Sequence, residues 1–138
     1  MRILPVCLYL FERQKKVCTS ENESIYMIHA VSALTHAHVR SQMACGIYYF
    51  LVKAILEEEG SLENRLQKGM DRVYQYYRKD LSNHRELENY KRLADLLEFK
   101  ENPKEGIKSS GYVVDTLEAA VWCLLHSHSY KETVLLAV

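Results

Sequence analysis

The sequence predicts an all-α fold, and three of its features support this prediction. Apolar residues recur three and four positions apart along most of the 138 residues, which is the spacing of one helix face. The chain contains only 2 Pro and 5 Gly, so few residues interrupt a helix. No segment shows the alternation of apolar and polar residues that is typical of a half-buried strand. The length allows one domain at most, or part of one.

Each helix is expected where a capping residue precedes an apolar stripe, which gives about six to seven helices. Ser20 and Glu23 have the spacing of a capping box, and Asp115 and Glu118 have a similar spacing. Residues 100–114 contain Pro, Gly and Ser without a helical period, so we expect one long loop there. In chain order, the expected helices lie within residues 1–11 and at about 21–35, 38–59, 62–77, 83–97, 117–125 and 131–138.

The charge balance and the lengths of the apolar runs exclude two classes of partner. Lys plus Arg is 18 and Asp plus Glu is 18, so no net charge attracts the chain to nucleic acid. The longest apolar run, residues 3–11, is shorter than the roughly 18–20 residues that cross a bilayer. It also lacks the features of a signal peptide. We therefore expect a cytoplasmic chain that binds neither nucleic acid nor a membrane.

The cysteines are expected to be reduced and buried, because none of them has a C-x-x-C spacing. The four are Cys7, Cys18, Cys45 and Cys123. A zinc site built from His36, His38 and Cys45, or from His126 and His128, would lack a fourth convergent ligand. The sequence therefore predicts no metal ligand in this chain.

Both ends of the chain are apolar, whereas the ends of a finished domain are usually polar and loosely held. Residues 1–11 are core-like from the start, and residues 133–138 end in an apolar helical pattern without a glycine or a basic last turn. This pattern indicates a piece of a larger helical protein.

Three segments carry a resemblance to a known family. They are Met1–Pro5 followed by an apolar helix, Ala33–His38, and Gly111–Leu125, of which the last is the most specific. In order and spacing they resemble the middle to late part of the ADP-ribosylglycohydrolase family, which includes the dinitrogenase reductase-activating glycohydrolases. Val134–Val138 resembles the helix before that family's final metal motif. The resemblance covers nearly the whole chain.

The resemblance implies that the chain is part of a larger orthogonal multi-helix bundle. Members of the family hydrolyse the glycosidic bond between ADP-ribose and a protein side chain, so ADP-ribose or an ADP-ribosylated protein is the implied partner. They use two magnesium ions, held by G-D-x-x-G, T-D-D and D-x-D-T motifs. None of these motifs occurs in this chain, and the family's N-G-S or N-G-A motif would lie immediately before Met1. We therefore expect the chain as given to be inactive.

By resemblance, His36 is a substrate-binding residue that faces the ADP-ribose cleft, and the residue types of Gly111 and Tyr112 make these two the other substrate-binding candidates. A ring N–H of His36 would donate to a phosphate or a ribose hydroxyl, and the alternative is that His36 only completes a helix end. Gly111 lets the backbone approach a ligand, and Tyr112 offers a ring face and a hydroxyl. The alternative for this pair is loop closure, with Tyr112 packed on Trp122.

The remaining candidates have structural interpretations, so we expect no catalytic residue in this chain. Asp115 and Glu118 lie in the most specific segment, and helix capping explains them. Arg2 either touches the edge of the cleft or extends from the first helix into solvent.

A second hypothesis is a non-catalytic helical interaction module. The apolar ends at residues 1–11 and 133–138 would then pair with a second copy or with a chain that supplies the missing helices. A third is a truncated product with no function.

Overall fold

The computed structural model describes residues 3–17, 19–108 and 110–137, and every regular element in these ranges is a helix, which confirms the all-α prediction. The elements are α1 (Leu4–Lys16), α2 (Glu21–Ala33), α3 (Val39–Glu57), α4 (Leu62–Tyr77), α5 (Leu81–Leu87), η1 (Glu88–Leu93), α6 (Leu96–Lys100), η2 (Lys104–Gly106), α7 (Val113–Leu125) and α8 (Tyr130–Leu136). Here η denotes a short 3-10 helix. Within the described ranges, no helix has both the length and the apolar character that crossing a bilayer requires.

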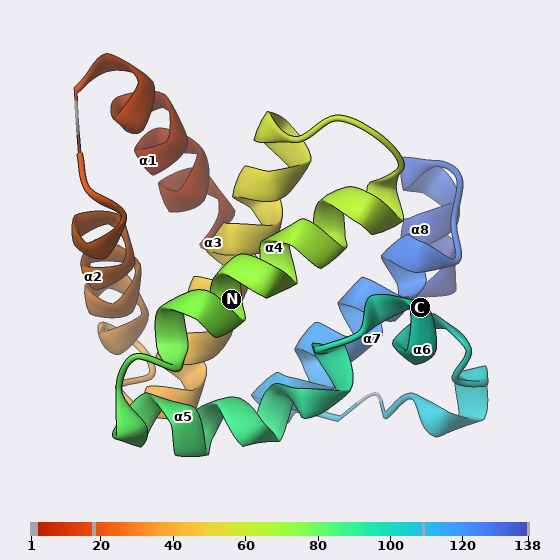
Figure 1. Cartoon of the computed structure of the whole chain (residues 1–138). Helices are drawn as coiled ribbons and strands as arrows, with labels where there is room; N and C mark the ends of the chain where they lie inside the picture. Colours follow the sequence, from red (N-terminus) through yellow and green to blue (C-terminus); the bar gives the residue numbers. More distant parts are fainter. Residues whose placement is uncertain (1–2, 18, 109, 138) are drawn as a thin grey trace.

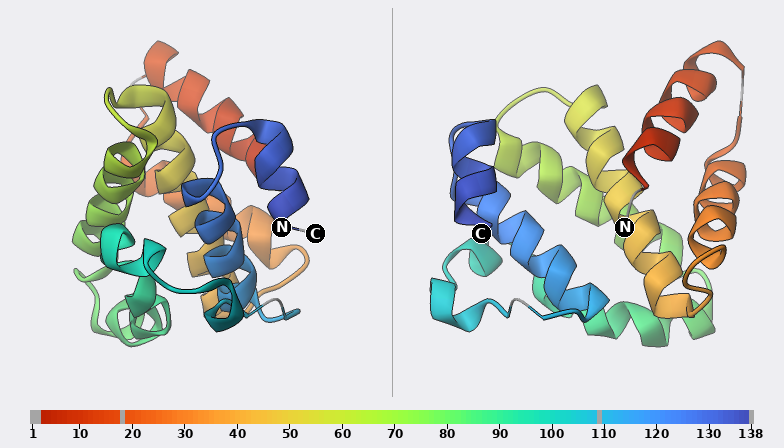
Figure 2. Two further views of the ribbon diagram at one scale, coloured as in Figure 1. Left: turned by 90° about the vertical axis from the view of Figure 1, so that its right-hand side faces the viewer. Right: turned by 180° about the vertical axis from the view of Figure 1, so that it is seen from behind.

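Helix α3 is the central element of the bundle. It packs most extensively against α4 and α2, and it also contacts α1, α5 and α7. Figures 1 and 2 show α1 and α2 on one side of α3, and α7 and α8 on the other. Fully buried apolar side chains fill the α3–α4 interface: Met43, Ile47, Phe50 and Ala54 from α3, and Leu66, Met70, Val73 and Tyr77 from α4.

The N-terminus of α2 forms the capping box that its sequence predicts. The Ser20 hydroxyl accepts a hydrogen bond from the Glu23 amide at 3.2 Å, and the Glu23 carboxylate accepts one from the Ser20 amide at 3.0 Å. Both amides lack a partner within the helix, so the box stabilises the start of α2. The hydroxyls of Ser61 and Ser129 likewise accept a backbone hydrogen bond and so cap α4 and α8.

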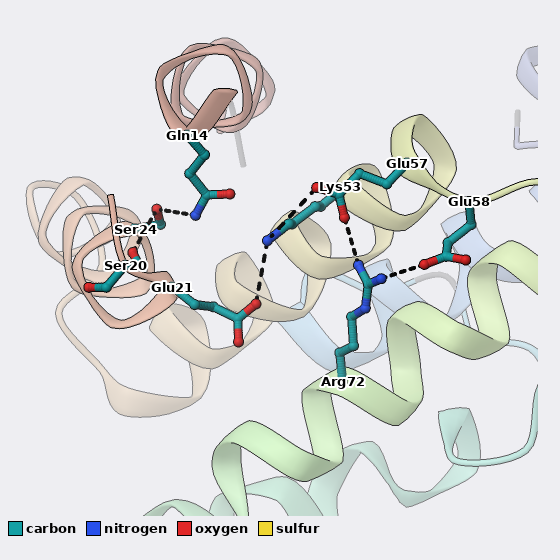
Figure 3. A network of polar contacts seen from close by, with 8 residues as sticks. All are labelled: Gln14, Ser20, Glu21, Ser24, Lys53, Glu57, Glu58 and Arg72. Carbon is teal, nitrogen blue, oxygen red and sulfur yellow. Dashed lines mark hydrogen bonds and ion pairs between the residues drawn. The ribbon is translucent and has the colours of Figure 1, made fainter. Parts of the chain in front are cut away.

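A network of charged side chains joins α2, α3 and α4 on the surface (Figure 3). Lys53 contacts Glu21 at 3.5 Å and Glu57 at 4.0 Å. Arg72 contacts Glu57 at 2.9 Å and also pairs with Glu58. The network lies near the C-terminal half of α3, away from the start of that helix.

The prediction of one continuous helix at about 83–97 is wrong. Asp80, not Asn83, caps α5, and its carboxylate accepts from the Ser82 amide at 2.9 Å. The Asp95 carboxylate then accepts from two amides, those of Leu97 and Glu98, both at 3.0 Å. An aspartate that takes up backbone amides in this way competes with helical hydrogen bonds, so the segment divides into α5, η1 and α6. The expected long loop is likewise shorter than predicted and contains η2.

The interpretation of Asp115 and Glu118 as a helix start is also wrong. Helix α7 begins at Val113, so Asp115 already lies in its first turn. Asp115 accepts a hydrogen bond from the Ser110 hydroxyl at 2.5 Å, which ties the loop to the helix. Glu118 is buried and pairs with Arg92 at 2.5 Å. A loop hydroxyl and a partly exposed arginine, neither of them part of the capping-box pattern, therefore determine what these carboxylates contact.

Candidate ligand-binding site

A cavity of about 770 Å³ lies where the end of α2, the start of α3 and the start of α7 meet. Its volume is in the range of small-molecule sites, roughly 300–1,000 Å³. The described residues that line it are Ile3, Val31, Ser32, Leu34, Thr35, His36, His38, Arg40, Ser41, Cys45, Gly111, Tyr112, Val113 and Thr116. The fold thus brings His36 to one cavity with Gly111 and Tyr112, although the chain separates His36 widely from this adjacent pair.

His36 lies in the turn that ends α2. Its amide donates to the Ser32 carbonyl at 2.8 Å, so its backbone completes the helix end. Its side chain is exposed, and Nδ1 lies 3.1 Å from the Thr35 hydroxyl. The backbone of His36 therefore completes the end of α2, and His36 is also one of the residues that line the cavity.

Tyr112 is the residue immediately before α7, and its hydroxyl accepts a hydrogen bond from Nη1 of Arg40 at 3.0 Å. The packing of Tyr112 on Trp122 that we considered is not observed. Trp122 instead stacks on His126, with ring centroids 4.0 Å apart, and donates to the Asn102 carbonyl at 2.9 Å. The stack forms because these two residues are four positions apart at the end of α7, on one helix face. Tyr112 is left 41% exposed at the cavity.

Gly111 precedes Tyr112 at an open position. A Cβ atom placed on Gly111 would meet nothing within 4 Å. The protein itself therefore does not require a glycine here, and the space beside this backbone remains available to a ligand.

Arg40 is the cavity residue that the sequence did not single out. Its Nε and Nη2 donate to the two carboxylate oxygens of Glu86 at 2.8 and 3.2 Å. These hydrogen bonds raise the pKa of Arg40 above its ordinary value. No short motif marks the pair, because Glu86 lies 46 positions further on, in α5. Only the fold brings it to the first turn of α3.

The permanent charge in the described cavity lining comes from Arg40, which is paired with Glu86 just outside the lining. Among the described lining residues, Arg40 carries a permanent charge and none is acidic. The other polar side chains are hydroxyls and imidazoles, including His38, whose Nδ1 accepts from the Arg40 amide at 3.1 Å and so caps α3. Such a lining favours an anionic or hydroxyl-rich ligand.

The donor set of the cavity does not fit magnesium. Magnesium prefers carboxylate oxygens in octahedral geometry, and the described lining residues offer none. More generally, the described ranges contain no group of three or more His, Cys, Asp or Glu side chains placed to hold a metal ion. The histidines and the cysteine considered for zinc, His36, His38 and Cys45, all border the cavity without forming such a group.

Three of the four cysteines are buried thiols, as predicted: Cys7, Cys45 and Cys123. Burial raises the pKa of all three thiols, that of Cys7 to about 12, so they are poor nucleophiles. The fourth, Cys18, lies outside the described residues, as do Arg2 and Val138.

The fold is an all-α bundle with a candidate ligand cavity at the junction of α2, α3 and α7, and comparison with known proteins gives its family. The family model described as ADP-ribosylglycohydrolase matches residues 1–138. The chain belongs to the ADP-ribosylglycohydrolase family, which confirms the resemblance found in the sequence.

Two curated relatives match a shorter part of the chain. The chain is 50% identical over 40 residues to the ADP-ribosylarginine hydrolase Tri1 of Pseudomonas putida (strain GB-1) and 48% identical over 40 residues to that of Serratia proteamaculans (strain 568). Each match covers 29% of this chain and 11% of the relative. The aligned part is thus a small share of either relative. No solved structure matches the chain significantly.

Proposed function

We propose that this chain forms one wall of the ADP-ribose-binding cleft of an ADP-ribosyl hydrolase. The observation that carries the proposal is the convergence of His36, Gly111 and Tyr112 on one cavity whose described lining includes Arg40 and no acidic residue. The family assignment rests on the sequence of the whole chain, whereas the convergence of these three residues is a property of the folded structure.

The chemistry of the cavity suits ADP-ribose. Its diphosphate is anionic, its two riboses are rich in hydroxyls, and its adenine has a flat apolar face. Arg40 supplies a charged guanidinium, and His36 supplies a ring nitrogen. Leu34 and Val31 supply apolar surface beside these groups. The lining therefore offers each part of the ligand a group of suitable character.

The hydrolytic step needs groups that this cavity lining does not supply. Cleavage of a ribosyl bond uses a carboxylate as acid or base, and a two-magnesium site needs several more. We infer that the parent protein is magnesium-dependent and that its carboxylates come from motifs absent from this sequence. The 138-residue chain then binds ADP-ribose without releasing it from a modified protein. The names of the two relatives make arginine-linked ADP-ribose the first substrate to test.

Titration calorimetry with ADP-ribose and the 138-residue chain tests the binding role. We expect saturable binding that His36→Ala weakens, and we expect unchanged binding in Tyr130→Phe, a matched change at an exposed tyrosine of α8. A folded wild-type chain that binds no ADP-ribose would contradict the proposal. Incubation with an arginine-ADP-ribosylated protein and magnesium tests the second part, and metal-dependent release of ADP-ribose would refute the inferred inactivity.

A different role, as a non-catalytic helical interaction module, has its own observation. Helix α1 exposes Leu4, Leu8 and Tyr9, and α8 exposes Val134 and Leu135. Exposed apolar side chains of this kind favour self-association or pairing with another chain. Sedimentation velocity decides between a monomer and an assembly, and a monomer at all concentrations would count against this role. The cytoplasmic location stays a prediction.

A further inference from the structure

Arg40 connects Tyr112 to the carboxylate of Glu86, a residue outside the cavity lining. Its guanidinium holds both oxygens of Glu86 and, through Nη1, the hydroxyl of Tyr112. The three residues come from α3, α5 and the start of α7, so the contact joins three elements that are distant in the sequence. A guanidinium is planar and presents its donors in a fixed fork, so the position of Glu86 determines where Nη1 points.

The anchor of this connection is itself held in place. The Asn89 side chain donates to the Glu86 carboxylate at 3.2 Å and to the Glu86 carbonyl at 3.0 Å. The buried Tyr90 donates its hydroxyl hydrogen to the Arg40 carbonyl at 2.7 Å. Both the backbone and the side chain of Arg40 are therefore fixed before any ligand enters.

Different contacts hold the backbone and the ring hydroxyl of Tyr112. Its amide donates to the Ser110 hydroxyl at 3.0 Å, and its carbonyl accepts from the Thr116 hydroxyl at 3.0 Å. These contacts hold the backbone to the first turn of α7. The ring is half exposed, and the hydrogen bond that the structure gives its hydroxyl comes from Arg40. The orientation of the hydroxyl thus depends on the guanidinium.

The direction of this hydrogen bond has a chemical consequence. Arginine can only donate, so the Tyr112 oxygen is the acceptor in the contact. Its own O–H is then free to donate into the cavity. We propose that Arg40, anchored by Glu86, is a positioning residue that presents the Tyr112 hydroxyl as a hydrogen-bond donor to an oxygen of the bound ligand. The identity of that ligand as ADP-ribose rests on the function proposed above.

The rival role for Arg40 is direct contact with an anionic group of the ligand, and a double-mutant cycle separates the two. Titration calorimetry with ADP-ribose is carried out on Tyr112→Phe, Arg40→Met and the double variant. One hydrogen bond corresponds to a loss of about three- to tenfold in affinity, which we expect for each single variant. In the Tyr112→Phe background, Arg40→Met should cost less than about twofold. An equal loss in both backgrounds would overturn the positioning role.

Two further variants sharpen the distinction. Arg40→Lys keeps the charge but loses the fork, so we expect nearly the full loss; retained affinity would support direct ion pairing instead. Glu86→Gln removes the anchor without altering the cavity lining, and we expect a loss in the same direction. Arg72→Met is the matched control, because Arg72 of α4 also forms ion pairs with glutamate, in its case Glu57 and Glu58, and is similarly exposed, but it lies near the opposite end of α3. It should leave the affinity unchanged.

A measurement without ligand tests the positioning itself. In a chain with ¹³C-labelled tyrosine rings, the Tyr112 signal is identified by its loss in Tyr112→Phe. Arg40→Met and Glu86→Gln should both shift this signal, and Arg72→Met should not. A signal unmoved by Glu86→Gln would overturn the inference. If the signal shifts while the wild-type chain binds no ADP-ribose, the positioning role stands and the proposed function falls.

Discussion

The hydroxyl oxygen of Tyr77 lies so close to Gly46 that a Cβ atom at this position of α3 would be 1.9 Å from it. The same hydroxyl is 2.8 Å from Nε2 of His29, and the two rings stack with centroids 5.9 Å apart. These three residues come from α3, α4 and α2, so the contact fixes how the three helices approach one another. Gly46 is required here for close approach and not for an unusual backbone angle.

Gly46→Ala should destabilise the chain by about 1–3 kcal/mol, the usual cost of overpacking a core. Tyr77 is fully buried, so the new methyl group must displace the Tyr77 hydroxyl that contacts His29. Urea unfolding measures the change. Gly106→Ala is the control, because its nearest contacts would be an ordinary 3.8 Å, and we expect a change within about 0.5 kcal/mol.

A second variant shows whether the clash is the cause. Tyr77→Phe removes the hydroxyl oxygen, so Gly46→Ala should cost less in the Tyr77→Phe background than alone. Equal costs in both backgrounds would show that the methyl group acts through something other than the hydroxyl.

The stability of the α2–α4 contact should depend on pH through His29. Burial lowers the pKa of His29 below its ordinary value of 6.5, so the folded chain favours the neutral ring. Its contribution is therefore complete above 6.5 and is lost as the pH falls through the lower folded value. Relative to His29→Gln, the wild-type chain should lose unfolding free energy as the pH falls below about 6.5. A difference that increases on acidification would contradict the assignment.

The surface network in Figure 3 should contribute little by comparison. Arg72 and its partners Glu57 and Glu58 are all partly exposed, and pairs of this kind contribute about 0–1 kcal/mol. We expect Arg72→Met to lower the unfolding free energy within that range, and 1 M salt to reduce the loss further by screening. A salt-independent loss above about 2 kcal/mol would indicate that packing of the arginine stem dominates.

The sequence predicted those parts of the fold that depend on local pattern. The Ser20–Glu23 box and the long stripe after His38 identify α2 and α3 almost to the residue, because capping and amphipathic spacing act within one helix. The predicted helix at about 83–97 failed first at Glu88, where α5 gives way to the 3-10 helix η1, and again at Asp95, whose side chain competes with the backbone and starts α6.

The candidate site was predictable only in part, because some of its contacts join residues that are distant in the sequence. Family resemblance indicated His36, and the residue types of Gly111 and Tyr112 at the start of the most specific segment indicated the other two. Arg40 escaped notice because its partner Glu86 and its contact Tyr112 lie 46 and 72 positions away. Long-range pairing of this kind is a property of the folded chain, and no spacing in the sequence marks it.

Glu118 should destabilise the folded chain as the pH rises, although it pairs with Arg92. Burial raises the pKa of Glu118 above its ordinary value of 4.5, and the attraction of Arg92 only partly offsets this. A raised folded pKa gives stability that is complete below 4.5 and is lost as the pH rises through the folded value. The unfolding free energy of the wild-type chain relative to Glu118→Gln should therefore fall as the pH rises above about 4.5, as measured by urea unfolding at each pH.

The same experiment with Arg92→Met isolates the role of the arginine. Arg92 also donates to the Asn102 side chain and to the Gly106 carbonyl, both at 3.3 Å, so it holds the loop that leads to Tyr112. Without the charge of Arg92, less attraction offsets the burial of the Glu118 carboxylate, so the folded pKa of Glu118 should rise further. The decline with pH should then be steeper in Arg92→Met than in the wild-type chain, as measured by urea unfolding at each pH. A relative stability that instead rises with pH would show that the ion pair outweighs the burial of the carboxylate.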